Sequence, residues 1–130
     1  MQRQLVSTST PWEDMAGYSR AVRVGNAVFV SGTTASDANG IVQHAGDPAA
    51  QTIYVLRKIE AALAEAGAGL SDVVRTRIFV RNIEDWEAVA RAHGSIFGAI
   101  RPANTLVRAE PIDPAMLVEI EAEARITGET

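Results

Sequence analysis

The sequence contains no cysteine in its 130 residues. This absence excludes disulfide bonds, thiol nucleophiles and thiolate metal sites, so any catalysis must use oxygen or nitrogen side chains or the backbone. Long apolar runs are also missing: no stretch reaches the roughly 18 apolar residues that span a membrane, and the N-terminus lacks the apolar segment of a signal peptide. We therefore expect a cytoplasmic protein with no membrane partner.

Positive charge is in the minority. Twelve Lys and Arg residues stand against sixteen Asp and Glu residues, which gives a net charge of -4, and the sequence pI is about 5.1. Such a chain has no general attraction for phosphate backbones, so we expect no nucleic-acid partner. The local cluster "RTRIFVR" is interpreted as arginines in solvent or at an interface.

What is present is the composition of one ordinary globular domain. Apolar residues make up 47% of the chain and charged residues 22%. A chain of this length buries enough surface for one core. We predict a single domain over residues 1–130.

The first third of the chain predicts a β-hairpin. Two β-rich runs in residues 20–35 flank Gly25 and Asn26, a pair that favours a tight turn with left-handed conformations available to both residues. A second turn is predicted at Asn39 and Gly40.

A helix is predicted from residue 48 to about residue 66. Asp47 can accept hydrogen bonds from free backbone N–H groups, and Pro48 suits the first helical position. Gly67 provides the left-handed stop. Apolar residues recur at helical spacing, and we expect them in the core: Val55, Leu56, Ile59, Ala62, Leu63 and Ala66.

The second half predicts strands around another helix. Alternating residues predict strands at about 73–80, 104–110 and 115–126. The segment 83–97 predicts a helix in which Gly94 weakens the last turn. The apolar face of this helix is expected to hold Trp86, Val89, Ala90, His93 and Phe97.

The element order is therefore β-β-α-β-α-β-β, with an extra short strand considered at residues 4–8. This order predicts an α+β fold of two layers, in which two helices cover one face of a mixed sheet. The other face would be covered by a partner subunit, so we expect an oligomer.

Five stretches carry a resemblance to a known family. They are "GYSRAVRVGNAVFVSG" (17–32), "AQTIYVLRKIEAALAEAGAGLSDVVRTRIFV" (50–80), "DWEAV" (85–89), "FGAIRPANTLV" (97–107) and "LVEIEAEA" (117–124). Together they cover nearly the whole chain, and the sequence resembles the Rid proteins (RidA-like reactive intermediate deaminases), also called the L-PSP endoribonuclease family.

The resemblance implies a chorismate-mutase-like fold and a homotrimer with clefts between its subunits. In the RidA branch the implied activity is hydrolysis of enamines and imines derived from amino acids, which yields a 2-keto acid and ammonia. The resemblance implies no cofactor and no metal.

Four site residues follow from the family's motifs. Tyr18 matches a tyrosine that orients the ligand, although a tyrosine packed at a subunit contact is the alternative. Ser31 and Gly32 match a "VSG" motif whose small side chains let a ligand approach the backbone, although a plain strand end would look the same. Glu119 matches the glutamate that handles the attacking water. Glu121 lies on the same strand face and is a less favoured actor.

Asn104 departs from the family pattern. In the deaminating branch this position holds an arginine that clamps the substrate carboxylate with two charge-assisted hydrogen bonds, and an asparagine amide offers neither charge nor fork. We therefore predict a paralogue outside the arginine-bearing branch, with a ligand that is neutral or bonded through the amide. Arg108 and Arg101 are the other arginines near this position that could hold a carboxylate, and Arg108 is a candidate binding residue.

The remaining polar candidates favour structural roles. His44 is expected in a solvated loop and His93 in the core with one satisfied ring nitrogen. Their spacing gives no metal motif, so no metal is predicted. Ser31 and Thr105 lack a histidine placed as their base.

Three functions stay open at this point. The first is an enzyme that hydrolyses a small imine or enamine with Glu119. The second is a non-catalytic trimer that binds or senses a small molecule in the same cleft. The third is a ribonuclease, which the acidic composition and 5% aromatic content disfavour.

Overall fold

The computed structural model describes residues 2–8 and 10–127. It holds a six-stranded sheet, three α-helices and two short 3₁₀ helices. The elements are β1 (Arg3–Val6), α1 (Pro11–Ala16), β2 (Ala21–Val24), β3 (Ala27–Thr33), α2 (Pro48–Glu65), a 3₁₀ turn (Leu70–Asp72), β4 (Val73–Val80), a second 3₁₀ turn (Ile83–Asp85), α3 (Trp86–Phe97), β5 (Ala103–Arg108) and β6 (Val118–Arg125).

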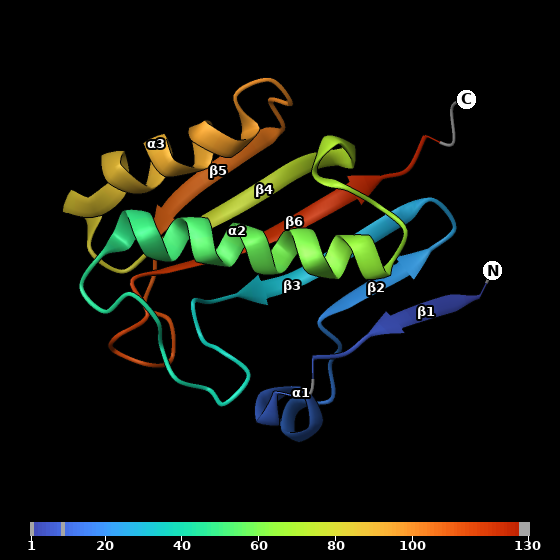
Figure 1. The fold of residues 1–130 in the computed structure, drawn as a ribbon, viewed down its shortest axis with the longest axis horizontal. Coiled ribbons are helices and arrows are strands. Elements are labelled where there is room, and N and C mark those ends of the chain that lie inside the picture. The colour runs from blue at the N-terminus through green and yellow to red at the C-terminus, as the bar shows by residue number, and fades with distance from the viewer. Residues whose placement is uncertain (1, 9, 128–130) are drawn as a thin grey trace.

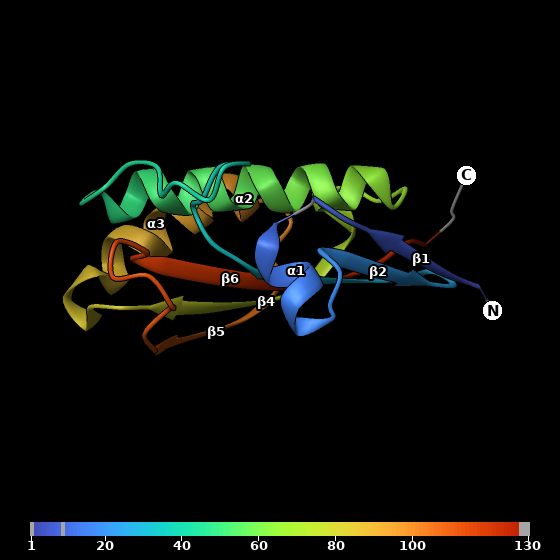
Figure 2. The same cartoon turned by 90° about the horizontal axis from the view of Figure 1, so that it is seen from below.

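The sheet has the strand order β1-β2-β3-β6-β4-β5. All neighbouring strands are antiparallel except β4 and β5, which are parallel. The two long helices, α2 and α3, lie together on one face of the sheet, and α1 lies at the rim near β2 (Figures 1 and 2). The predicted α+β fold with two layers is therefore confirmed, and the extra strand considered near the N-terminus is β1.

The helix signals predicted α2 closely. The Asp47 carboxylate accepts a hydrogen bond of 3.0 Å from the Ala50 backbone N–H, and Gly67 takes a left-handed φ of 85° after the last turn. All six apolar residues expected in the core are buried. The helix is held by these caps and by burial of its apolar face on the sheet.

Strand β6 fixes which side chains face the helices. Its buried residues Val118, Ile120, Ala122 and Ala124 alternate with half-exposed glutamates. Because successive side chains of a strand point to opposite faces, Glu119 lies on the sheet face that α2 and α3 leave open. β6 is an inner strand between β3 and β4, and Glu119 lies near the end of the sheet where β6 begins.

Three local expectations were wrong. Helix α1 was missed, because six residues are too few to show a helical period, although Pro11 and Gly17 are typical start and stop residues. In the hairpin turn only Gly25 takes a positive φ, of 60°, which is the pattern of a turn with glycine at its first central position. Trp86 is 51% exposed and does not join the core.

No helix within residues 2–8 and 10–127 has the length and apolar character needed to cross a membrane.

Candidate active site

A small cavity opens at the rim of the sheet, where the segment around α1 meets the end of β3 and the start of β6. Its volume is about 60 Å³, and its lining includes Tyr18, Arg20, Gly32, Met116 and Glu119. This space holds a few water molecules or one end of a small ligand. The structure therefore brings together three of the predicted site residues, and their roles stay predictions.

Glu119 is the central ionisable group of this cavity. Burial raises the pKa of its carboxyl above the ordinary value, the nearby Arg20 opposes that rise, and Glu121 adds to it. A carboxylate that is partly removed from water holds a proton more readily than an exposed one, which favours a role in proton transfer.

Gly32 allows the Glu119 side chain to occupy its place. A Cβ atom on Gly32 would collide with Oε2 of Glu119. Because real Cβ atoms do not tolerate such an approach, any larger residue at position 32 would displace the carboxylate. Steric contact with Glu119 therefore explains why position 32 holds a glycine. This explanation is separate from the predicted approach of a ligand to the backbone.

Arg20 is the cavity residue that the sequence analysis missed. Its side chain is 6% exposed, and its Nη2 donates a hydrogen bond of 2.7 Å to the Gly32 carbonyl oxygen. The guanidinium carbon lies 5.8 Å from the centre of the Tyr18 ring. No sequence signal marks Arg20, because it lies in the bend before β2 and its burial and hydrogen bond are visible only in the structure.

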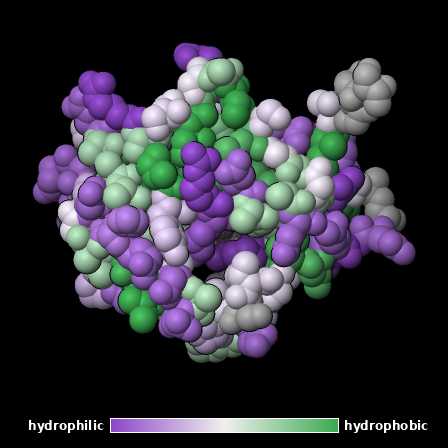
Figure 3. Space-filling model, in the orientation of Figure 1, coloured by the Kyte–Doolittle hydropathy of each residue, from purple (hydrophilic) through white to green (hydrophobic). Residues whose placement is uncertain are grey.

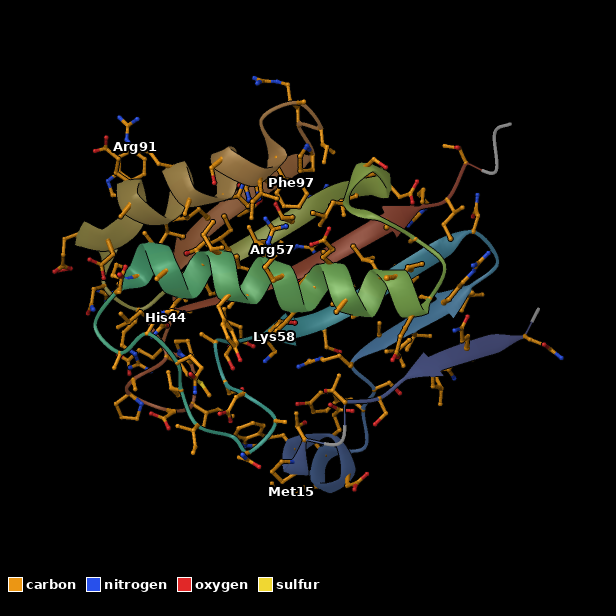
Figure 4. All side chains as sticks on the ribbon, in the orientation of Figure 1. Met15, His44, Arg57, Lys58, Arg91 and Phe97 are labelled. Atoms are coloured by element: carbon orange, nitrogen blue, oxygen red, sulfur yellow. The ribbon has the colours of Figure 1, made fainter. Side chains whose placement is uncertain are left out.

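Lys58 fixes the loop that forms another wall. From α2 its ammonium donates hydrogen bonds of 2.7 Å to the Thr34 carbonyl oxygen and 2.8 Å to the Ser36 carbonyl oxygen, and both of these loop residues line the cavity. Burial lowers the pKa of Lys58 to about 8, with a further lowering from the positive charge of Arg20. Figure 4 shows Lys58 extending from α2 on the side of α1.

Ser31 lies next to this cavity without entering it. Its Oγ donates a hydrogen bond of 2.7 Å to the Ser19 carbonyl oxygen. It lines a neighbouring open depression of about 410 Å³ that Tyr18 also borders. Tyr18 therefore borders both spaces, and the hydroxyl of Ser31 is bonded to the segment that precedes β2.

Asn104 lies in a different cleft. Its Nδ2 donates a hydrogen bond of 2.9 Å to Thr76 Oγ1, and the same hydroxyl lies 2.9 Å from Nε2 of His93. This cleft, of about 360 Å³, is bordered by α3 and also contains Arg101. Because Asn104 pairs with the buried Thr76 across the parallel strands, it faces the helix side of the sheet. Within one chain, Asn104 and Glu119 therefore lie on opposite faces of the sheet.

Arg108 joins neither cavity. It shares a face with Asn104, as the alternation predicted, because both pair with buried residues of β4. It stands four residues further along β5 with an exposed side chain, about 13 Å away at the rise of a strand. Arg101 takes a left-handed φ of 58° in the turn before β5.

The histidine predictions are confirmed. His93 is 9% exposed, its ring centre lies 4.7 Å from that of Phe97, and burial lowers its pKa, which favours the neutral ring. His44 is exposed in the loop before α2.

No cluster of His, Asp and Glu able to hold a metal occurs in residues 2–8 and 10–127.

Residues 8–126 match the family model described as Endoribonuclease L-PSP. A 3-aminoacrylate deaminase, RutC, of Acinetobacter baylyi is 34% identical over 126 residues, which cover 97% of this chain and all of that protein. An uncharacterized protein of Streptomyces coelicolor is 39% identical over 120 residues, which cover 92% of this chain and 89% of that one.

Among solved structures, a similar one is a Mycobacterium tuberculosis protein, Rv2704, described as a member of the YjgF/YER057c/UK114 family. It has a TM-score of 0.87 and 48% identity, and the match covers 96% of this chain and all of that chain. The matches in sequence and the match in fold thus both cover nearly the full length of this chain.

Proposed function

The chain belongs to the Endoribonuclease L-PSP family, the same Rid family that its sequence resembles, and from this membership we propose that it hydrolyses a small reactive imine or enamine in a cleft between subunits. The observation that carries the proposal is the half-buried Glu119, whose raised pKa suits proton transfer. The relative named 3-aminoacrylate deaminase supports a reaction at a C–N bond.

The proposed reaction balances with water as the second substrate. An enamine first takes a proton from solvent on carbon and becomes an iminium. Glu119 removes a proton from water as the water oxygen attacks the iminium carbon, and the C=N double bond becomes a single bond in a carbinolamine. The glutamic acid then returns the proton to nitrogen, the C–N bond breaks and ammonia leaves, while the hydroxyl proton passes to the Glu119 carboxylate and from there to solvent as the carbonyl forms. No cofactor takes part.

The intersubunit cleft is part of the proposal. In one chain Asn104 faces the helix side of the sheet and Glu119 faces the open side. A neighbouring chain in a homotrimer would supply the second surface, and Asn104, Arg108 and Tyr18 remain the proposed ligand contacts. Asn104 is itself bonded to Thr76, so this position offers no carboxylate clamp of the arginine type.

The proposal is tested by ammonia release. The purified protein is added to 2-aminoacrylate and to other imines generated in place by a separate enzyme. We expect release of ammonia and of the carbonyl product faster than in buffer alone. If no member of a panel of charged and uncharged imines decays faster with the protein than without it, the proposed hydrolysis is wrong.

The second candidate is a non-catalytic binding protein that uses the same cavity. The specific observation in its favour is Asn104, which removes the family's charged anchor. Such a protein would be stabilised against heat by its ligand without forming product, because a ligand that binds only the folded state raises apparent stability. Thermal unfolding with and without each compound therefore distinguishes the two functions.

A further inference from the structure

Arg20 carries a buried charge that no carboxylate of the described residues balances by an ion pair. The comparison within the molecule is direct: Arg77, at the open face, pairs with Glu121 at 2.8 Å and with Glu123 at 3.3 Å. Arg20 is far more buried, and its one side-chain hydrogen bond within residues 2–8 and 10–127 goes to a backbone carbonyl. Buried charges in proteins are ordinarily paired, and the Glu119 carboxylate acts on Arg20 without forming an ion pair with it among the described residues, so donors of Arg20 remain for an anion in the cavity.

The donors of Arg20 are held in place and not saturated. The bond from Nη2 to the Gly32 carbonyl fixes the guanidinium at the cavity wall, with the Tyr18 ring nearby. Nε is buried and has no hydrogen-bond partner. Because Nε has almost no exposed surface, a ligand in the cavity would meet the Nη groups, and a guanidinium that is already fixed loses little side-chain freedom when a planar oxyanion binds.

We propose that Arg20 binds the carboxylate of the ligand from within the Glu119 cavity and so takes over the anchoring that Asn104 does not supply. This inference rests on the proposed function, and it narrows the ligand to a small molecule with a carboxylate beside its reactive C–N bond. It also replaces the expectation of a neutral ligand.

Negative charge also lies near the cavity. The carboxylates of Glu13 and Asp37 act on Lys58, and Glu13 accepts hydrogen bonds from the hydroxyls of Ser7, Thr8 and Thr10. Arg20 is the cation that shares the cavity with Glu119. A ligand carboxylate would be repelled by Glu119 alone, and the guanidinium next to both offsets that repulsion.

Arg20 also borders a second small cavity, which lies next to α2. This cavity has a volume of about 130 Å³, and Lys58, Thr8 and Glu65 also line it. Figure 3 shows a hollow with hydrophilic side chains at its border below the position of α2. Arg20 thus lies between the Glu119 cavity and this second cavity. We expect the ligand carboxylate to bind in the Glu119 cavity.

The test measures binding and needs no turnover. Pyruvate and pyruvamide have nearly the same size and differ in charge, so they are titrated into the wild-type protein and followed by NMR. We expect pyruvate to bind about tenfold more tightly or better, because a charged hydrogen bond is lost in the amide. The backbone amides around Gly32 should respond first.

Three variants locate the charge. Arg20→Gln should reduce the preference for pyruvate to about one. Arg23→Gln is the matched control: it removes the same charge from the neighbouring strand, where Arg23 also donates to backbone carbonyls outside the Glu119 cavity, and it should leave the preference unchanged. Arg20→Lys keeps the charge without the fork and should retain part of the preference.

Equal binding of pyruvate and pyruvamide to the wild type would overturn the inference, even if Arg20→Gln fails to fold. So would a preference that disappears in Arg101→Gln and persists in Arg20→Gln, because the anion would then lie in the Asn104 cleft. Failure of the proposed hydrolysis is a separate result, since it would appear as absent ammonia release with pyruvate binding intact.

Discussion

Burial of the Glu119 carboxylate makes its charged form unfavourable, which lowers the free energy of unfolding of the protein. Burial raises its pKa, so at a pH between the ordinary and the raised value the folded protein binds more protons than the unfolded protein. The free energy of unfolding therefore falls as the pH rises through that window. We expect Glu119→Gln to be more stable than the wild type at pH 7 in denaturant unfolding, with the difference vanishing as both proteins are brought below pH 4.

The control for this prediction is Glu121→Gln. Glu121 lies on the same face of β6 and pairs with Arg77, so its removal should bring no gain at pH 7. A Glu119→Gln protein that is less stable than the wild type at pH 7, or a difference that does not change with pH, would contradict the assigned burial.

Residue identities could be predicted only in part. The motifs pointed to Tyr18, Gly32 and Glu119, which share one cavity. Arg20 was missed because its importance depends on burial and on a hydrogen bond to Gly32, and the letters around it show neither. The link between Asn104 and His93 through Thr76 was likewise invisible, since it needs the register of β4 and β5.

At the scale of elements, α3 contains a glycine that its packing does not require. A Cβ atom at Gly94 would meet no atom within 4 Å. Because glycine in a helix interior costs about 0.5–1 kcal/mol relative to alanine, we expect Gly94→Ala to raise the free energy of unfolding by about that amount.

Gly98, one turn later, supplies the contrast. There a Cβ atom would lie 2.9 Å from the Gly94 carbonyl oxygen, so Gly98→Ala should bring no gain. Chemical denaturation of both variants measures the difference. Equal gains would mean that the end of α3 is packed differently.

The long elements were predictable for a stated reason. Helix α2 has a proline and a carboxylate at its start, a left-handed glycine after its end and an apolar stripe between them. Helix α1 has the end signals without the stripe, because six residues make fewer than two turns. Trp86 follows the helical period and is nonetheless exposed, since it stands at the first residue of α3.

At the scale of the molecule, we predict a homotrimer. The open face presents Phe29, which is 43% exposed, and the ion pairs of Arg77, a surface that a partner chain would cover. Light scattering should give three times the chain mass of 13.9 kDa. A monomer with full activity would contradict both the trimer and the intersubunit cleft.

The order of the strands explains why the whole site could not be predicted from one sequence. Glu119 and Asn104 belong to β6 and β5, which β4 separates, and their faces follow from two registers, one antiparallel and one parallel. Alternation within each strand gave the correct faces one strand at a time. How those faces are related across the sheet required the structure.

The central claim is that Glu119 transfers the proton during hydrolysis of an imine. The most direct measurement compares ammonia release from freshly generated 2-aminoacrylate by the wild type, Glu119→Gln and Glu121→Gln. We predict that Glu119→Gln loses activity by about a hundredfold or more, the usual worth of a general acid or base, while Glu121→Gln stays within a few-fold of the wild type. Full activity in a folded Glu119→Gln protein would contradict the account.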